Sequence, residues 1–210
     1  MEGEGHFLTD KIRVAVLFGG RSAEHEVSIM SAANVLEAID RSRFDVVPIA
    51  ISRTGNWRLL EDGARPARDI PKSSVEVALI PGGNGRLTVI EPTGASRTVD
   101  AVDVVFPVLH GPFGEDGSMQ GYAEIAGVAY VGCGVFASAA AMDKAMAKLL
   151  LRAQGLAVAD GRLLRREDAV SIEDLQGELG PVLFIKPARQ GSSVGVSRVG
   201  GNGADFDTAL

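Results

Sequence analysis

Three short apolar runs, each followed by a turn that contains glycine, constrain the fold of this chain more than any other feature. Residues 13–18 read RVAVLF and stop at Gly19-Gly20, and residues 45–52 (DVVPIAIS) and 103–109 (DVVFPVL) follow the same pattern. Continuous runs of Val, Ile and Phe of this length are typical of parallel strands that are buried on both faces. The sequence therefore predicts a largely parallel sheet covered by helices.

Helical periodicity fills the segments between these runs. After the first run, Ile29, Ala33 and Leu36 recur at helical spacing, and residues 118–127 (SMQGYAEIAG) predict a second helix. Residues 61–100 carry weaker signals, and there only the segment RLTVIE alternates like a short strand. Strands that alternate with helices in this way favour an α/β fold.

The chain is expected to divide near residue 142. Residues 1–141 predict an N-terminal α/β domain with a doubly wound, mostly parallel sheet. Residues 142–210 predict a smaller α+β unit that starts with a helix, for which Asp143 is a suitable N-cap. The apolar face of this helix consists of Met142, Met146, Leu149, Leu150 and Ala153.

The remainder of this second part has three further predicted elements. They are a short strand near residues 162–165 (RLLR), a helix near 171–179, and a hairpin that pairs 182–185 with 194–199. So few elements bury little apolar surface by themselves. We therefore expect the second part to be an incomplete α+β subdomain.

Composition and charge exclude several classes of function. The chain has 21 Lys and Arg residues against 27 Asp and Glu residues, a formal net charge of -6, which disfavours nucleic acid and anionic membranes as partners. Its single cysteine rules out an internal disulfide framework, and its three histidines lack metal-ligand spacing. The N-terminus has no signal-peptide pattern, and no apolar run approaches the length needed to cross a bilayer. We expect a soluble, cytoplasmic protein.

The segment KPARQGSSVGVSRV, residues 186–199, has the composition of an anion-binding loop. Gly191 and Gly195 permit close backbone approach, the serines Ser192 and Ser193 offer hydroxyl and amide donors, and Lys186 adds a positive charge. The loop is not a Walker A motif, because the lysine precedes the glycines and a strand follows. Local chemistry alone leaves two interpretations open, an ordinary polar hairpin and a phosphate cradle.

Four motifs together resemble the D-alanine-D-alanine ligase family of the ATP-grasp superfamily. They are LFGGRSAEHEVS, HGPFGEDGSMQG, MDKAMAK and FIKPARQGSSVGVS, and they occur in the family's order over about residues 13–199. The resemblance implies an N-terminal α/β domain followed by two α+β subdomains that grasp ATP. It also implies that this chain holds the first domain and most of the central subdomain, without the C-terminal one.

The resemblance implies an ATP-dependent reaction. One D-alanine carboxylate is phosphorylated, and the amine of a second D-alanine attacks the acyl phosphate to give a dipeptide for peptidoglycan synthesis. Lys144 and Lys186 match the family's phosphate-contacting lysines, and Ser193 with the adjacent amides would cover the phosphates as a lid. The loop at residues 186–199 is then interpreted as a phosphate cradle.

Three further residues match substrate-binding or catalytic positions of the family. Glu24 corresponds to the carboxylate that holds the ammonium of the first D-alanine, and Ser192 to the serine that links it to a tyrosine on a later loop. His110 corresponds to a histidine that could face the carboxylate of the first D-alanine. Without the family, Glu24 is a favourable first-turn charge and His110 a turn or cap residue.

The resemblance places the magnesium ligands outside these 210 residues. Glu115 and Asp116 are therefore interpreted as structural rather than as a metal pair. We expect ATP and Mg²⁺ as cofactors, D-alanine as substrate, and a homodimer formed through the N-terminal domain. By itself the chain is expected to be inactive.

Other functions remain open from the sequence. They include a D-alanine-D-lactate ligase and a non-catalytic nucleotide or amino-acid binding module with a similar first domain. An NAD-dependent dehydrogenase is disfavoured, because LFGGRSAEHE is not G-x-G-x-x-G and the second run lacks a terminal acid to hold a ribose.

Overall fold

The computed structural model describes residues 11–67, 74–91, 93–200, 206, 208 and 209. The chain divides into two compact units, residues Met1–Gly134 and Val135–Leu210. This division precedes the expected boundary at residue 142, because α3 (Val135–Met142) belongs with the second unit.

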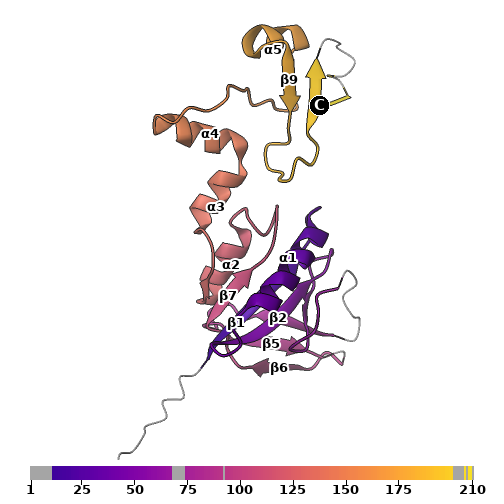
Figure 1. Cartoon of the computed structure of the whole chain (residues 1–210), viewed down its shortest axis with the longest axis vertical. Helices are drawn as coiled ribbons and strands as arrows, with labels where there is room; N and C mark the ends of the chain where they lie inside the picture. Colours follow the sequence, from indigo (N-terminus) through magenta and orange to yellow (C-terminus); the bar gives the residue numbers. More distant parts are fainter. Residues whose placement is uncertain (1–10, 68–73, 92, 201–205, 207, 210) are drawn as a thin grey trace, which may run out of the picture. The chain divides into compact units, whose positions relative to one another are not determined.

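The first unit is built on a sheet of eight strands in the order β6-β5-β4-β3-β2-β1-β7-β8 (Figure 1). The strands are β1 (Ile12–Gly19), β2 (Phe44–Ile51), β3 (Trp57–Leu59), β4 (Val75–Leu79), β5 (Leu87–Ile90), β6 (Ser96–Val99), β7 (Val104–Pro107) and β8 (Ala129–Tyr130). The α/β fold class predicted from the sequence is confirmed.

The three apolar runs form the strands β1, β2 and β7, as predicted, and these pair in parallel. The register pairs Ile12 with Phe44 and Gly19 with Ile51, so β1 and β2 end at the same edge of the sheet. The strands from β3 to β6 extend the sheet with antiparallel pairs. The strands β4 to β6 lie in the segment with weak sequence signals, residues 61–100, and β3 lies just before it.

Two helices cover opposite faces of the sheet. Alternate residues of a strand point to opposite sides, so each helix packs against a different set of strand residues. Ala15 and Leu17 of β1 pack in one cluster with Met119 of α2 (Ser118–Ala126), while Val16 packs in the other with Ile29 of α1 (His25–Ala38). Both Val16 and Leu17 are 0% exposed. Full burial of such a side chain stabilises the fold by about 1.5–3 kcal/mol.

The buried stripe of α1 differs from the predicted one. It consists of His25, Ser28, Ile29 and Ala32, whereas Ala33 and Leu36 are only half-buried. The polar side chains of His25 and Ser28 find backbone partners beneath the helix, which lets them occupy the buried face. An apolar pattern alone could not identify them.

The second unit contains α3, α4 (Lys144–Ala153), α5 (Ile172–Leu179), β9 (Val182–Ile185) and β10 (Ser197–Gly200). Asp143 caps α4 as predicted, because its side chain accepts hydrogen bonds from the amides of Ala145 and Met146. The helix α5 lies beside the β9–β10 hairpin (Figure 1). The core of this unit consists of Ile172, Leu175, Leu183, Val199 and Phe206.

Two details of this unit correct the sequence predictions. Residues 162–165 form no strand, because no other strand pairs with them in the described part of the chain and Leu163 is 50% exposed. The second hairpin strand begins at Ser197 rather than at Val194, because residues 192–195 form tight turns.

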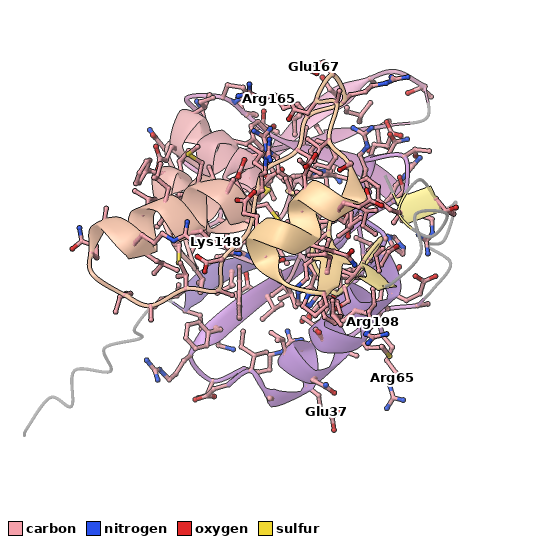
Figure 2. All side chains as sticks on the ribbon, turned by 90° about the horizontal axis from the view of Figure 1, so that it is seen from above. Glu37, Arg65, Lys148, Arg165, Glu167 and Arg198 are labelled. Atoms are coloured by element: carbon pink, nitrogen blue, oxygen red, sulfur yellow. The ribbon has the colours of Figure 1, made fainter. Side chains whose placement is uncertain are left out.

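Charged side chains such as Glu37 and Arg65 project from the surface (Figure 2). Among the described residues, no helix combines the length and apolar character that a membrane span requires.

Candidate functional site

The turn after β1 organises a candidate site within the first unit. Gly19 has φ +89° and Gly20 has φ +95°, a region that favours glycine. The amide of Gly19 donates to Ser28 Oγ at 2.8 Å, and Ser28 Oγ donates in turn to the carbonyl of Val108. His25 Nδ1 donates to the carbonyl of Gly20 at 2.7 Å. These contacts fasten the ends of β1 and β7 to α1.

Glu24 and His110 lie on the two loops that this network positions. The Glu24 amide donates to Ser22 Oγ at 3.1 Å, and a Cβ placed on Gly111 would lie 2.6 Å from Glu24 Oε2. His110 Nε2 lies 3.2 Å from Ser31 Oγ of α1. The structure thus brings Glu24 close to the residue that follows His110, at the carboxyl ends of parallel strands, where open α/β sheets bind ligands.

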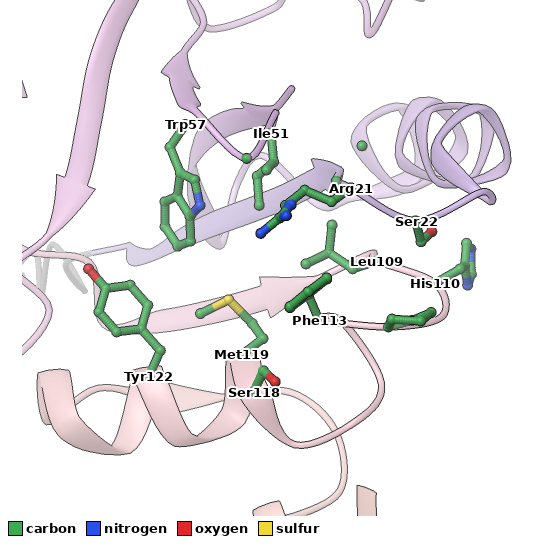
Figure 3. Close-up of a pocket in the computed structure, with 15 residues that line it drawn as sticks. Arg21, Ser22, Ile51, Trp57, Leu109, His110, Phe113, Ser118, Met119 and Tyr122 are labelled. Carbon is green, nitrogen blue, oxygen red and sulfur yellow. The ribbon is translucent and has the colours of Figure 1, made fainter. Parts of the chain in front are cut away.

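A pocket of about 190 Å³ opens beside these residues (Figure 3). Its apolar wall includes Trp57 and Tyr122, whose rings meet edge to face with centroids 5.8 Å apart. Arg21 lies over the ring of Phe113, with 4.8 Å between the guanidinium carbon and the ring centroid. Ser22 and His110 also line the pocket.

Sequence analysis missed Arg21 and Phe113 as site residues. Both lie inside the motifs LFGGRSAEHEVS and HGPFGEDGSMQG, so motif membership was the available signal. The pairing itself joins two loops that are far apart in the sequence, and no local pattern indicates it.

Glu115 and Asp116 serve the turn that follows His110. Glu115 Oε2 accepts the Gly111 amide at 2.6 Å, and Asp116 accepts the amides of Phe113 at 2.9 Å and Ser118 at 3.0 Å. Partial burial opposes ionisation of Asp116, but these amides outweigh it and lower its pKa. No group of three or more potential metal ligands occurs in the part of the chain that the structure describes.

A second candidate site lies within the second unit, where α4 begins against the loop of residues 186–196. Lys144 Nζ donates to the carbonyls of Pro187 at 3.1 Å and Gln190 at 2.6 Å. The amide of Lys144 donates to the carbonyl of Ala188 at 3.0 Å. The structure therefore brings Lys144 to the loop on which the other predicted phosphate-binding residues lie.

Lys186 begins this loop, with Nζ 5.8 Å from the centroid of the Phe184 ring. Ser192 has φ 46° and Ser193 has φ 57°, so two consecutive non-glycine residues adopt the left-handed conformation. The amides of Val194 and Val196 donate back to the carbonyls of Gly191 and Ser193. A strained loop of this kind is typical of ligand-binding segments.

Asp143 bonds both to α4 and to the loop of residues 186–196, whereas the sequence predicted only its role as the N-cap. Its Oδ1 accepts the amides of Ala145 and Met146, while its Oδ2 accepts from Arg189 Nε at 2.9 Å. The bond from Arg189 is the main cause that lowers the pKa of Asp143, with the amide of Met146 acting in the same direction.

Known proteins match almost the whole chain. The family model described as "D-ala D-ala ligase N-terminus" matches residues 13–133. D-alanine–D-alanine ligase A of Mesorhizobium japonicum is 62% identical over 196 residues, which cover 91% of this chain and 54% of that protein. D-alanine–D-alanine ligase A of Brucella suis is 46% identical over 200 residues, covering 95% of this chain and 56% of that protein.

Solved structures agree with these relatives. The D-alanine-D-alanine ligase of Coxiella burnetii matches with a TM-score of 0.83 and 31% identity, covering 95% of this chain and 57% of that chain. The VanG D-Ala:D-Ser ligase of Enterococcus faecalis matches with a TM-score of 0.74 and 33% identity, covering 95% of this chain and 58% of that chain. The chain spans little more than half the length of each of these proteins. Because the family model covers more than half of the chain and the relatives extend the match over nearly all of it, the chain belongs to the D-alanine–D-alanine ligase family.

Proposed function

We propose that this chain supplies the first-substrate and phosphate-binding parts of an ATP-dependent ligase that joins two D-alanine molecules. The observation that carries the proposal is the contact between the start of α4 and the loop of residues 186–196. It assembles Lys144 with the loop that carries Lys186, Ser192 and Ser193. Family membership supplies the identity of the reaction.

The cationic residues suit the charge that the reaction develops. In the proposed first step, a carboxylate oxygen of D-alanine bonds to the γ-phosphorus of ATP and ADP leaves. Lys144 and Lys186 offset the negative charge of the phosphate oxygens, and Ser193 with the neighbouring amides covers them. Phosphorylation turns a poor electrophile into an acyl phosphate.

The proposed second step forms the peptide bond. The amine of the second D-alanine attacks the acyl carbon, inorganic phosphate leaves, and the amine loses a proton. Glu24 holds the ammonium of the first D-alanine by a charge-assisted hydrogen bond, and His110 faces its carboxylate. For Ser192 we propose the role of the family's matching serine, which links the carboxylate that corresponds to Glu24 to a tyrosine on a later loop.

Mg²⁺ is proposed as a cofactor from the family resemblance, and the described residues include no group of three or more potential metal ligands. This half of the fold is compatible with more than one second substrate, because the VanG D-Ala:D-Ser ligase of Enterococcus faecalis shares it. D-alanine is proposed because the more identical relatives carry that name. A cytoplasmic homodimer is proposed on the sequence alone.

A chimera tests the proposal directly. This chain replaces the matching part of the M. japonicum ligase, and D-alanyl-D-alanine and ADP are measured with ATP, magnesium and D-alanine. The chimera should form both products, whereas this chain alone should form neither. A folded chimera that binds ATP and D-alanine without forming dipeptide would instead support the binding-module alternative. D-lactate added beside D-alanine tests the depsipeptide alternative.

A matched pair of lysines isolates the proposed phosphate contact. Lys144 and Lys148 lie on the same helix, but Lys148 Nζ donates to the carbonyl of Asp160, outside the loop. Lys144→Ala should lower the turnover of the chimera by about 100-fold or more, as expected for loss of a charge-stabilising donor. Lys148→Ala should leave it near wild type. Equal effects of the two substitutions would overturn the assignment of Lys144.

A further inference from the structure

Four consecutive loop residues contact the first turn of α4. The carbonyls of Pro187, Ala188 and Gln190 accept from Lys144, and the guanidinium of Arg189 donates to Asp143. The contacts to Lys144 use its backbone amide and its ammonium group. The contact between Arg189 and Asp143 is the one ion pair that joins these two segments in the described part of the chain.

Asp143 is suited to hold this contact and cap the helix at the same time. Its Oδ1 accepts the helix amides, which leaves Oδ2 for Arg189 Nε at 2.9 Å. The Asp143 side chain is 15% exposed, although that of Arg189 is 78% exposed. A carboxylate fixed by two backbone amides presents its second oxygen in a defined position and loses little freedom when Arg189 binds.

We propose that Arg189 and Asp143 are positioning residues that hold the loop of residues 186–196 at a fixed spacing from Lys144. The inference rests on the proposed function, in which cations on the helix and on the loop converge on ATP phosphates. Two hydrogen atoms of the Lys144 ammonium are committed to the loop carbonyls. Because an ammonium group has three donors, one is left for a phosphate oxygen.

Loss of the ion pair between Arg189 and Asp143 should weaken the binding of ATP and not that of D-alanine. Without the ion pair, more of the restraint on the loop falls on the hydrogen bonds of Lys144, so the ammonium group must restrain the loop and bind phosphate at once. Pre-organisation of a binding loop improves affinity by reducing the ordering cost on binding. Loss of the pair should therefore raise KM for ATP and leave KM for the first D-alanine unchanged.

Variants of the chimera separate this role from helix capping. Asp143→Ser keeps a side-chain oxygen that can cap the helix, but serine is neutral and cannot form an ion pair with Arg189. Arg189→Met removes the guanidinium group and keeps an unbranched apolar side chain. Each should raise KM for ATP about two- to fivefold, within the range expected for one exposed ion pair. The double variant should be no worse than either single one, because both remove the same contact. Arg189→Lys keeps a positive charge, so its KM for ATP should lie between those of wild type and Arg189→Met.

An ion pair elsewhere in the second unit provides the control. Arg152 on α4 bonds to Asp160 at 2.8 Å, a contact that does not touch the loop. Arg152→Met should leave all kinetic constants unchanged. Equal effects of Arg152→Met and Arg189→Met on KM for ATP would overturn the proposal, as would additive effects of Asp143→Ser and Arg189→Met.

Amide hydrogen exchange on this chain without nucleotide gives a readout independent of activity. The Lys144 amide, which donates to Ala188, should exchange faster in Arg189→Met than in wild type. If the wild-type chimera forms no dipeptide, the proposed function fails while this exchange test still decides the positioning role. Unchanged exchange at Lys144 in both Asp143→Ser and Arg189→Met would overturn that role, whatever the chimera does.

Discussion

The carboxylate of Glu24 lies directly against the bare Cα of Gly111, because a Cβ built on that glycine would come 2.6 Å from Glu24 Oε2. This contact joins the loop after β1 to the loop after β7. Gly111 has φ +70°, so its backbone conformation also favours glycine. The glycine thereby leaves room for the side chain that we propose binds the first D-alanine.

Gly111→Ala should displace the Glu24 carboxylate and weaken D-alanine binding about tenfold or more, measured by isothermal titration or as KM in the chimera. The left-handed backbone should also cost about 1–2 kcal/mol in the free energy of unfolding. Gly63→Ala is the control, since Gly63 has φ +79° with nothing within 4 Å of the added Cβ. It should show the stability loss without the loss of D-alanine affinity. Equal D-alanine affinities in both variants would contradict the role of Glu24.

Ser28→Ala should reduce the free energy of unfolding by about 2–4 kcal/mol, measured by urea denaturation of this chain. Ser28 is 0% exposed, and its hydroxyl bonds both the Gly19 amide and the Val108 carbonyl. Alanine leaves both backbone groups buried without a partner. Ser42→Ala, which removes an exposed hydroxyl bonded to Asp40, should change stability by less than about 0.5 kcal/mol. A similar small change in Ser28→Ala would show that the network does not stabilise the site.

Ser31→Ala should raise KM for D-alanine in the chimera severalfold with little change in kcat. Its hydroxyl lies 3.2 Å from His110 Nε2 and is proposed to orient that ring toward the substrate. Ser31→Thr, which keeps the hydroxyl, should restore KM to near the wild-type value. Thermal denaturation should be similar for all three proteins. If alanine and threonine at position 31 give the same KM, the hydroxyl does not position His110.

Asp116→Asn should make the stability of this chain less dependent on pH in the acidic range. The pKa of Asp116 is lower in the folded chain than the ordinary aspartate value of 3.8. Its stabilising contribution is therefore complete above the ordinary carboxyl pKa and is lost as pH falls through the lower folded value. Urea midpoints at pH 7 and near pH 3 should differ more in wild type than in Asp116→Asn. An identical difference in the two proteins would rule out this contribution.

Local sequence patterns were sufficient for much of the fold. The apolar runs that form β1, β2 and β7 need burial on both faces, which the central strands of a parallel sheet covered by helices receive. The N-cap at Asp143 was also predictable, because the residues that satisfy it lie within one helical turn. The family motifs indicated Lys144 and the loop of residues 186–196, which the structure places in contact.

The sequence by itself determined which segments must be buried and which motifs carry charge near a turn, since these depend on neighbours a few residues apart. Only the tertiary structure decided that Glu24 faces Gly111, that Ser28 bonds to Val108 across 80 positions, and that Arg189 pairs with Asp143 across 46 positions. The antiparallel strands β3 to β6 were likewise decided by pairing with the edge of β2. Such contacts form between residues that are far apart in the sequence. Their energies depend on both partners, so no short stretch of sequence predicts them.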